Sequence, residues 1–273
     1  MSSLLIRTCL FFLSFPGLSR FYGRLVRIER PRWLVRWVIR LFARRYRISM
    51  NDFTGEFGDY ASLSAFFTRP LDPAKRPMPA DDRHILAPAD SVLSVCETVR
   101  DDRATQVKGR QYRLTGLVGE PFDLSRGWRV AVFYLSPHDY HRFHLPMAAT
   151  VIAARRDGGS LYPVNLLSVS NIPDLFIRNE RVTLKCETAG EVWYYVAVGA
   201  TFVGAVSTVA GVIPTAGSWY PVGRELPQSA ETGRFDMGST IVTLIPVALA
   251  GEPLVAEGEK VRTGDRIWER RGG

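Results

Sequence analysis

The sequence contains few cysteines. Three occur among 273 residues, Cys9, Cys96 and Cys186, and they are odd in number and widely spaced. A disulfide framework needs paired cysteines, and a zinc site of the usual kind needs closely spaced cysteine or histidine ligands. The sequence therefore indicates neither, and a reducing compartment fits it best.

The sequence also lacks a long hydrophobic run. The apolar stretch Leu10–Leu13 lies between Arg7 and Arg20, and Pro16 and Gly17 interrupt the residues between those arginines. A helix needs roughly 20 apolar residues to cross a bilayer core of about 30 Å. No small-residue cleavage site of a signal peptide follows the run. We predict that this segment lies on a membrane rather than crossing it.

Acidic residues and lysine are almost absent from residues 1–50, which hold eleven arginines, no lysine and one acid, Glu29. A strongly basic segment indicates an anionic partner, either a membrane or a nucleic acid. No recognisable nucleic-acid-binding motif accompanies the arginines, which favours the membrane. A hydrophobic content of 46% excludes a disordered chain.

An amphipathic helix is predicted to begin near Pro31, where proline is tolerated. One side of this helix is apolar and consists of Leu34, Trp37, Val38, Leu41 and Phe42. The other side carries an arginine every four residues, at Arg32, Arg36, Arg40 and Arg44. This pattern is typical of an interfacial anchor, so we predict that the four arginines and Trp37 face a membrane. The alternative is a helix packed on the protein body, with solvated arginines.

From about residue 84 the sequence changes to short, strand-like apolar runs separated by Gly, Pro and Asp. Examples of these runs are Val92–Val99, Trp128–Leu135, Val182–Cys186, Val192–Val198, Thr201–Val209 and Ile241–Val247. No long amphipathic helix is predicted after residue 84. We therefore predict an α+β, mainly β fold, with an antiparallel-sheet body at residues 71–273. Residues 1–70 are predicted to form a helical, membrane-associating region, in which Asp59 or Ser62 caps a short helix that Pro70 ends.

The stretch Phe235–Thr240, which precedes the run Ile241–Leu244, is a candidate for chemistry. Glycine before serine leaves the Gly238 carbonyl carbon sterically open. Ser239 Oγ can then add to that carbon, shift the acyl group from nitrogen to oxygen and leave a more labile ester. Gly-Ser-Thr before a strand is most often an ordinary turn, so self-cleavage needs a base and a group that orients the base.

Three of the four histidines lie within seven residues, at His138, His141 and His144. Histidine is the side chain best suited to move protons near neutral pH. A metal site is the rival interpretation, but no HEXXH pattern or cysteine pair completes a ligand shell, so we predict no metal. We expect His138 and His84 to be buried structural residues that form hydrogen bonds. Upstream, Asp90 can be a turn former, or it can fix the tautomer of an imidazole as a triad acid does.

Together these elements resemble the phosphatidylserine decarboxylase family, the self-processing pyruvoyl enzymes of phospholipid synthesis. That family carries, in order, a Pro-x-Asp-Gly element, a Ser-Pro-x-Asp-Tyr-His-Arg-x-His-x-Pro block and a Gly-Ser-Thr cleavage site. The matching segments here are Pro88–Ser91, Ser136–Pro146 and Gly238–Thr240, with further similarity at Phe66–Leu71, Arg76-Pro77, Val164-Asn165, Arg178–Val182, Val198–Ala200 and Gly233–Phe235. The chain departs from the family pattern at Ser91 in place of Gly and at Thr232 in place of Met, and His138 occupies a variable position.

The resemblance implies a role for each candidate residue. Asp90 orients His144 and holds its charge, His144 deprotonates Ser239, and the chain is cut between Gly238 and Ser239. Loss of the Ser239 α-proton and hydrolysis of the resulting dehydroalanine leave a covalent pyruvoyl group, so no external cofactor is needed. The pyruvoyl ketone takes up the serine amine of phosphatidylserine and accepts the electrons left by departing carbon dioxide. His141 is the implied proton donor that completes phosphatidylethanolamine.

The resemblance also implies a peripheral enzyme on the cytoplasmic face of the inner membrane, where arginines bind anionic lipid. The two cleaved chains form a heterodimer that dimerises further, without nucleic acid. Three alternatives stay open. They are a pyruvoyl decarboxylase of a soluble amino acid, a serine hydrolase that uses Asp90, His144 and Ser239 on a lipid ester, and an inactive membrane scaffold. The hydrolase is disfavoured because the Gly-x-Ser-x-Gly elbow is absent and Ser239 precedes its strand.

Overall fold

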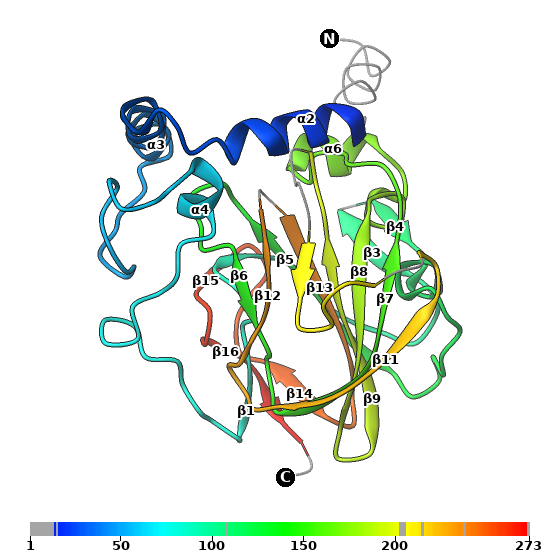
Figure 1. Ribbon diagram of the computed structural model, residues 1–273. Coiled ribbons are helices and arrows are strands. Elements are labelled where there is room, and N and C mark those ends of the chain that lie inside the picture. Colours follow the sequence, from blue (N-terminus) through cyan, green and yellow to red (C-terminus); the bar gives the residue numbers. More distant parts are fainter. Residues whose placement is uncertain are drawn as a thin grey trace.

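The structure is a computed structural model (Figure 1), and it describes residues 14, 16–107, 109–201, 206–213, 216–236 and 239–271. The predicted α+β, mainly β fold with antiparallel sheets is confirmed. The helices are α2 (Pro16–Val26), α3 (Arg32–Tyr46), α4 (Leu63–Phe67), α5 (Leu114–Val118), α6 (Leu166–Asn171) and α7 (Leu175–Arg178). The strands are β1 (His84–Leu86), β2 (Ser91–Val99), β3 (Ala104–Val107), β4 (Arg110–Tyr112), β5 (Trp128–Leu135), β6 (Arg142–His144), β7 (Ala149–Asp157), β8 (Arg181–Thr188), β9 (Glu191–Val198), β10 (Val206–Thr208), β11 (Trp219–Leu226), β12 (Glu231–Phe235), β13 (Ser239–Pro246), β14 (Ala250–Pro253), β15 (Lys260–Val261) and β16 (Arg266–Arg270).

The largest sheet has eight strands in the order β11-β7-β8-β9-β13-β5-β2-β15, and each neighbouring pair is antiparallel. Strand β13 lies inside this sheet, between β5 and β9. All of its residues are buried. Three smaller sheets, β1-β16-β14, β10-β12-β6 and β3-β4, accompany it.

Both faces of the large sheet are covered by apolar side chains, which explains the near-continuous apolar sequence of its central strands. Successive side chains of a strand point to opposite faces. Accordingly, Ile241 and Ile245 of β13 belong to one buried cluster, and Val242 and Leu244 belong to another. Two cores therefore hold β13 in place, one on each face.

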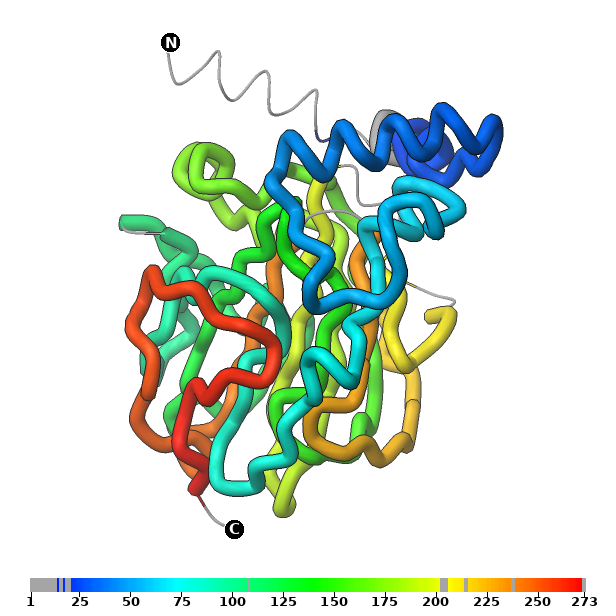
Figure 2. The backbone as a smooth tube through the Cα atoms, turned by 90° about the vertical axis from the view of Figure 1, so that its left-hand side faces the viewer, coloured from blue at the N-terminus to red at the C-terminus, as the bar shows by residue number. Residues whose placement is uncertain are grey.

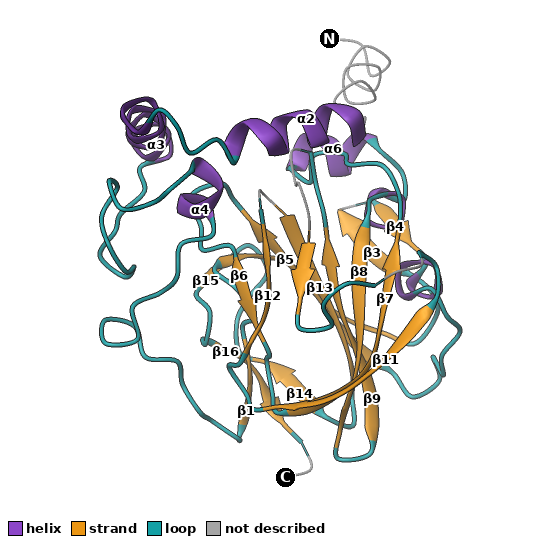
Figure 3. Cartoon of the chain, in the orientation of Figure 1, coloured by secondary structure: helices purple, strands orange, loops and turns teal. Residues whose placement is uncertain are grey.

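The N-terminal helices α2 and α3 lie at one end of the sheet, next to α4 (Figures 2 and 3). Their own small core includes Val26 of α2, Ile39 of α3 and Phe66 of α4. Ser62 Oγ accepts a hydrogen bond from the backbone N–H of Ala65 over 3.2 Å, which confirms Ser62 as the predicted cap of α4.

Most of the predicted strands are confirmed with small changes of boundary. Strand β5 has the predicted bounds. Strands β2, β8 and β9 are longer than predicted by one to three residues, and β13 begins two residues earlier than predicted, at Ser239. The predicted run Thr201–Val209 yields only β10, and residues 202–205 lie outside the described residues. Helices α5, α6 and α7 have four to six residues each, as expected for a body without long helices.

Candidate active site

Ser239 is the first residue of β13, and its backbone pairs with Leu135 of β5. Its side chain is fully buried, and its Oγ has no hydrogen-bond partner within the described part of the chain. The expected cleavage partner Gly238 lies outside the described residues. An unpaired buried hydroxyl costs about 1–3 kcal/mol. Thr240 and Thr243 of β13 are in the same state, and Ser239 differs from them in directly following Gly238.

His144 ends strand β6, and both of its ring nitrogens have partners. Nδ1 lies 2.8 Å from the carbonyl oxygen of Ser229, and Nε2 lies 3.0 Å from the hydroxyl of Tyr140. Because a carbonyl oxygen can only accept, Nδ1 carries the proton and Nε2 accepts from Tyr140. Burial lowers the pKa of His144, against the opposing effects of the Ser229 carbonyl and of nearby carboxylates. His144 is therefore a neutral imidazole whose Nε2 is the basic atom.

His141 is also held as a neutral imidazole. Its Nδ1 lies 2.9 Å from the carbonyl oxygen of Asp139, and its buried Nε2 has no partner among the described residues. The ring of Phe67 packs on it, with 3.9 Å between ring centroids. Burial lowers the pKa of His141 to about 3. In this state His141 can accept a proton at Nε2, and it can act as a donor only after it has accepted one.

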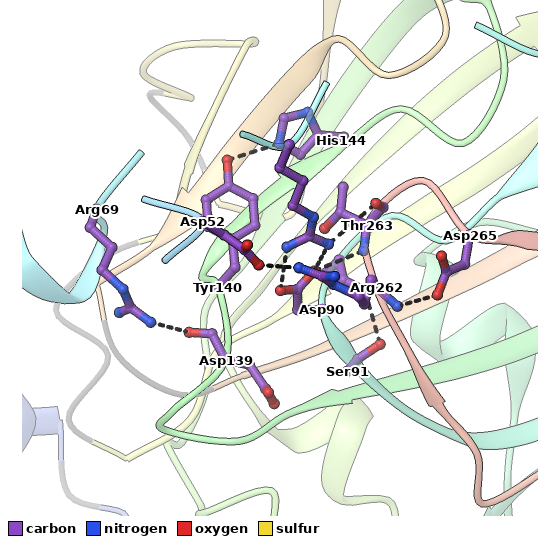
Figure 4. Close-up of polar contacts among 12 residues, drawn as sticks. Asp52, Arg69, Asp90, Ser91, Asp139, Tyr140, His144, Arg262, Thr263 and Asp265 are labelled. Atoms are coloured by element: carbon purple, nitrogen blue, oxygen red, sulfur yellow. Dashed lines mark hydrogen bonds and ion pairs between the residues drawn. The ribbon is translucent and has the colours of Figure 1, made fainter. Parts of the chain in front are cut away.

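Asp90 lies between β1 and β2, and its carboxylate is held at both oxygens. Arg76 donates two hydrogen bonds to it, one of them 2.8 Å long. The N–H of Thr263, which lies beside Asp90 in Figure 4, donates a third over 2.8 Å. The hydrogen bonds of His144 go instead to Ser229 and Tyr140. Asp90 still acts on His144 through space, since its charge raises the pKa of the imidazole. The structure thus brings Asp90 into the electrostatic environment of His144 without a hydrogen bond between them in the described residues.

Arg69, directly after α4 and its C-cap, holds the loop that carries the histidines. Its side chain is fully buried, and its Nη2 donates to the His138 carbonyl oxygen over 3.1 Å. The guanidinium lies 4.1 Å from the ring centroid of Phe53. Burial lowers the pKa of Arg69 to about 10, so the group keeps its charge at neutral pH. Because Phe67 of α4 packs on His141, this short helix and the arginine that follows it both contact the segment that carries the histidines.

The residues predicted to face a membrane are all exposed. The predicted apolar side of α3 only partly coincides with its packed side, because Val38 and Phe42 pack against the N-terminal core whereas Leu34 is exposed. The buried stripe of α3 is Val35, Ile39 and Ala43. Trp33, Trp37 and Leu41 are 71%, 58% and 53% exposed, and they follow one another at four-residue spacing. Arg32, Arg36, Arg40 and Arg44 are exposed as well. Helix α3 therefore packs on the body and also leaves an apolar stripe and an arginine stripe on its outer surface.

The other predicted residues have ordinary contacts. His84 is partly buried, and its Nδ1 lies 2.9 Å from Asp81. His138 is exposed and faces Asp139, so the prediction that it is buried was wrong. The described residues contain no group of three or more histidine, cysteine or acidic side chains placed to hold a metal ion. Nor do those residues form a helix long and apolar enough to cross a membrane.

Sequence reasoning missed three groups that contact the expected residues. Tyr140 and Arg76 lie within the quoted motif segments, so their position next to His144 and Asp90 was open to prediction. Ser229 acts through its backbone carbonyl, which every residue type has. Nothing in the sequence therefore indicated it.

Comparison with known proteins agrees with the motifs. The family model described as phosphatidylserine decarboxylase matches residues 63–269. The phosphatidylserine decarboxylase proenzyme of Methylococcus capsulatus is 37% identical over 240 residues, which cover 84% of this chain and 83% of the relative. The proenzyme of Shewanella loihica is 38% identical over 242 residues, covering 83% of this chain and 84% of the relative. That of Marinobacter nauticus is 36% identical over 265 residues, covering 91% and 92%.

Proposed function

The chain belongs to the phosphatidylserine decarboxylase family, and we propose that it converts phosphatidylserine to phosphatidylethanolamine with a pyruvoyl group made from its own Ser239. The observation that carries this proposal is the Ser239 hydroxyl, buried and unpartnered among the described residues at the start of β13. A nucleophile that attacks the preceding carbonyl must not be engaged by a competing hydrogen bond. The orphaned hydroxyl meets that requirement.

The proton of Ser239 is taken by His144. Its imidazole is neutral, with Nδ1 committed to the Ser229 carbonyl, so Nε2 is the atom that accepts. The hydroxyl of Tyr140, now on Nε2, must turn away or pass the proton along. The imidazolium that forms keeps its Nδ1 hydrogen bond, and the charges of Glu231 and Asp90 favour it. Attack on the Gly238 carbonyl replaces the amide bond by an ester to Ser239 Oγ. Loss of the Ser239 α-proton then expels the Gly238 carboxylate and separates residues 1–238 from residues 239–273.

The residues present fit a pyruvoyl group at position 239. When formed, this group supplies a ketone that accepts electrons as the carboxylate leaves as carbon dioxide. The ring of Phe67 packs on His141, whose buried Nε2 has no partner among the described residues, so this imidazole is shielded from water. We assign His141 to deliver the proton to the product carbon. Because it is neutral in the uncleaved chain, it must first take up that proton during the reaction.

The substrate is a membrane lipid, and the site lies beside the surface suited to reach it. Helix α4 contacts His141 through Phe67 and packs with α3 in the N-terminal core. The outer surface of α3 presents Trp33, Trp37 and Leu41 with the arginine stripe beside them. Aromatic and aliphatic side chains enter the interface, and arginines attract anionic headgroups. We therefore place the enzyme on the membrane surface, and we extend the proposal to the cytoplasmic face of the inner membrane.

The proposal includes two features of organisation. Residues 1–70 form the membrane-associating region and residues 71–273 the decarboxylase body. Two processed protomers, each made of the two cleaved chains, associate into a dimer.

The first test is the intact mass of the purified protein under denaturing conditions. We expect two fragments that meet between Gly238 and Ser239, the smaller one lighter than its sequence by the mass of one ammonia. A S239A variant should remain a single chain. A single full-length mass for the wild type after prolonged incubation would reject self-processing. A serine hydrolase or an inactive scaffold would then be the favoured function.

A second assay identifies the substrate. Processed protein is mixed with phosphatidylserine in detergent micelles, or with free serine, and released carbon dioxide is measured. Release from the lipid alone supports the proposal. Release from free serine at an equal or greater rate would instead indicate a decarboxylase of soluble amino acids.

A further inference from the structure

Arg76 binds the Asp90 carboxylate in a fixed orientation. Its two terminal nitrogens each reach a different carboxylate oxygen, and the Nη1 contact is 2.8 Å long. Paired hydrogen bonds of this kind fix the plane of the carboxylate as well as its position. The side chains are only 10% and 17% exposed, so water screens this ion pair less than a surface pair.

Thr263 completes the enclosure of Asp90. Its N–H donates to Asp90 Oδ1 over 2.8 Å, and its carbonyl oxygen accepts from Arg76 Nη2 over 3.4 Å. Arg76 and Asp90 belong to the expected large fragment, whereas Thr263 belongs to the small one. Asp90 is thus held by groups from both sides of the expected cut.

Each carboxylate that acts on His144 has an arginine of its own. Asp90 pairs with Arg76, and Glu231 of β12 pairs with Arg142 at 3.0 Å. An ion pair acts at a distance as a dipole, so its field on a third group is weaker than that of an isolated charge. Burial is the main cause of the lowered pKa of His144, and the two carboxylates raise that pKa whereas Arg76 lowers it.

We infer that Arg76 is a positioning residue for self-processing: it holds the Asp90 carboxylate in place and offsets its charge at His144, so that His144 rests as a neutral base. This inference rests on the proposed function. A base must be unprotonated before it can accept the Ser239 proton. An Asp90 without its arginine would raise the pKa of His144 and leave less of the imidazole neutral. With Arg76 present, the charge of Asp90 stabilises a proton on His144 less strongly in the resting chain.

Other charged groups surround Arg76 and Asp90, and none of them is changed in the variants that test this inference. They are Arg69 and Asp139, which interact with Asp90, and Asp52 and Asp265, which interact with Arg76. Tyr140, which donates to His144, also stays in place.

The first experiment measures the charge effect without any cleavage. In the S239A chain, the pKa of His144 is followed by NMR titration of its imidazole carbons. We expect R76M to raise this pKa by about half a unit to one unit, because a neighbouring positive charge is lost. R76K should leave it unchanged, and D90N/R76M should return it toward the starting value. R83M removes an arginine whose side chain is 83% exposed and serves as the matched control.

The second experiment measures self-cleavage of chains with an intact Ser239 as a function of pH. We expect R76M to move the rising limb of the rate to higher pH by the same amount. R76K keeps the charge but loses the paired geometry, so the rate should fall severalfold at every pH with an unchanged midpoint. R76Q replaces R76M if the methionine variant does not fold, as judged by its melting curve.

The outcomes separate this inference from the proposed function. An unchanged His144 pKa and midpoint in R76M, or wild-type rates in R76K, would overturn the role of Arg76 even if the wild type cleaves normally. A wild type that never cleaves refutes the proposed function, yet the titration in the S239A chain still decides whether Arg76 sets the charge of His144.

Discussion

Arg27, one residue beyond the end of α2, forms an ion pair with Asp236, three residues before Ser239. The two residues are far apart in the sequence, and the Asp236 side chain is 12% exposed. The pair therefore ties the expected membrane-associating region to the segment that enters the expected cleavage site. No other element of the N-terminal region contacts that segment through an ion pair among the described residues.

Charge reversal tests this link. R27D places two acids together, so we expect self-cleavage to slow by about two- to fivefold, in keeping with the ~1 kcal/mol of a partly exposed ion pair. The double variant R27D/D236R restores the opposite charges and should recover most of the rate. Rates are measured from the fraction of cleaved chain on denaturing gels. Equal rates in all three proteins would show that the pair has no part in processing.

His141 makes the stability of the uncleaved chain depend on pH. The pKa of His141 is about 3 in the folded chain and about 6.5 in the unfolded chain. At a pH between these two values, only the unfolded chain binds this proton. The free energy of unfolding should therefore fall as the pH drops through that window, with a slope that approaches ~1.4 kcal/mol per pH unit from this residue. Denaturant unfolding of the S239A chain between pH 7 and pH 4 measures the slope.

The contribution of His141 is isolated by substitution. H141Q in the S239A background should flatten the slope, because glutamine does not titrate. H84Q changes a partly buried histidine outside the site and is the matched control. A slope that is the same in H141Q and in the parent chain would contradict the buried, neutral state of His141.

The two fragments are expected to stay together after the cut. The smaller fragment carries β13, which lies between β5 and β9 with every residue buried. It also carries β15, which pairs with β2, and β16, which pairs with β1. Separating the fragments would break these ladders and expose both cores. Native mass spectrometry should show one complex, and the fragments should separate only in denaturant. Free small fragment in native buffer would contradict this packing.

The outer surface of α3 predicts how the protein binds membranes. W33A/W37A removes two exposed aromatic side chains that contribute little to the N-terminal core, so binding to vesicles should weaken by tenfold or more while the melting temperature barely changes. L254A, which truncates an exposed leucine after β14, is the matched control. Sedimentation with vesicles that contain phosphatidylserine gives the affinities. Unchanged binding of W33A/W37A would show that the protein contacts the membrane through another surface.

A second series isolates the arginines. R36Q/R40Q should lose affinity for anionic vesicles and lose little for zwitterionic ones, and added salt should reduce the difference, because headgroup attraction is electrostatic. Equal losses on both vesicle types would contradict a specific role for the positive charge.

Much of the fold could be predicted because local sequence decides it. β5, β9 and β13 are mostly apolar because both of their faces are buried, and such a run is visible in the sequence alone. The cap at Ser62 and the start of α3 after Pro31 depend on residues next to each helix. Strand β6 was missed because a strand of three residues has too little pattern to distinguish it from a loop.

The sequence by itself determined the family, the order of the motifs and the identity of Asp90, His144 and Ser239 as candidates, because these depend on residue types in a fixed order. The tertiary structure alone decided their partners. Arg76 rather than His144 binds Asp90, and a backbone carbonyl 85 residues away sets the tautomer of His144. It also decided which side of α3 packs, since a helix with apolar residues on two sides has no single periodicity that identifies its buried face. Contacts between distant segments, and contacts through backbone atoms, carry no local signal, and only the folded chain brings them together.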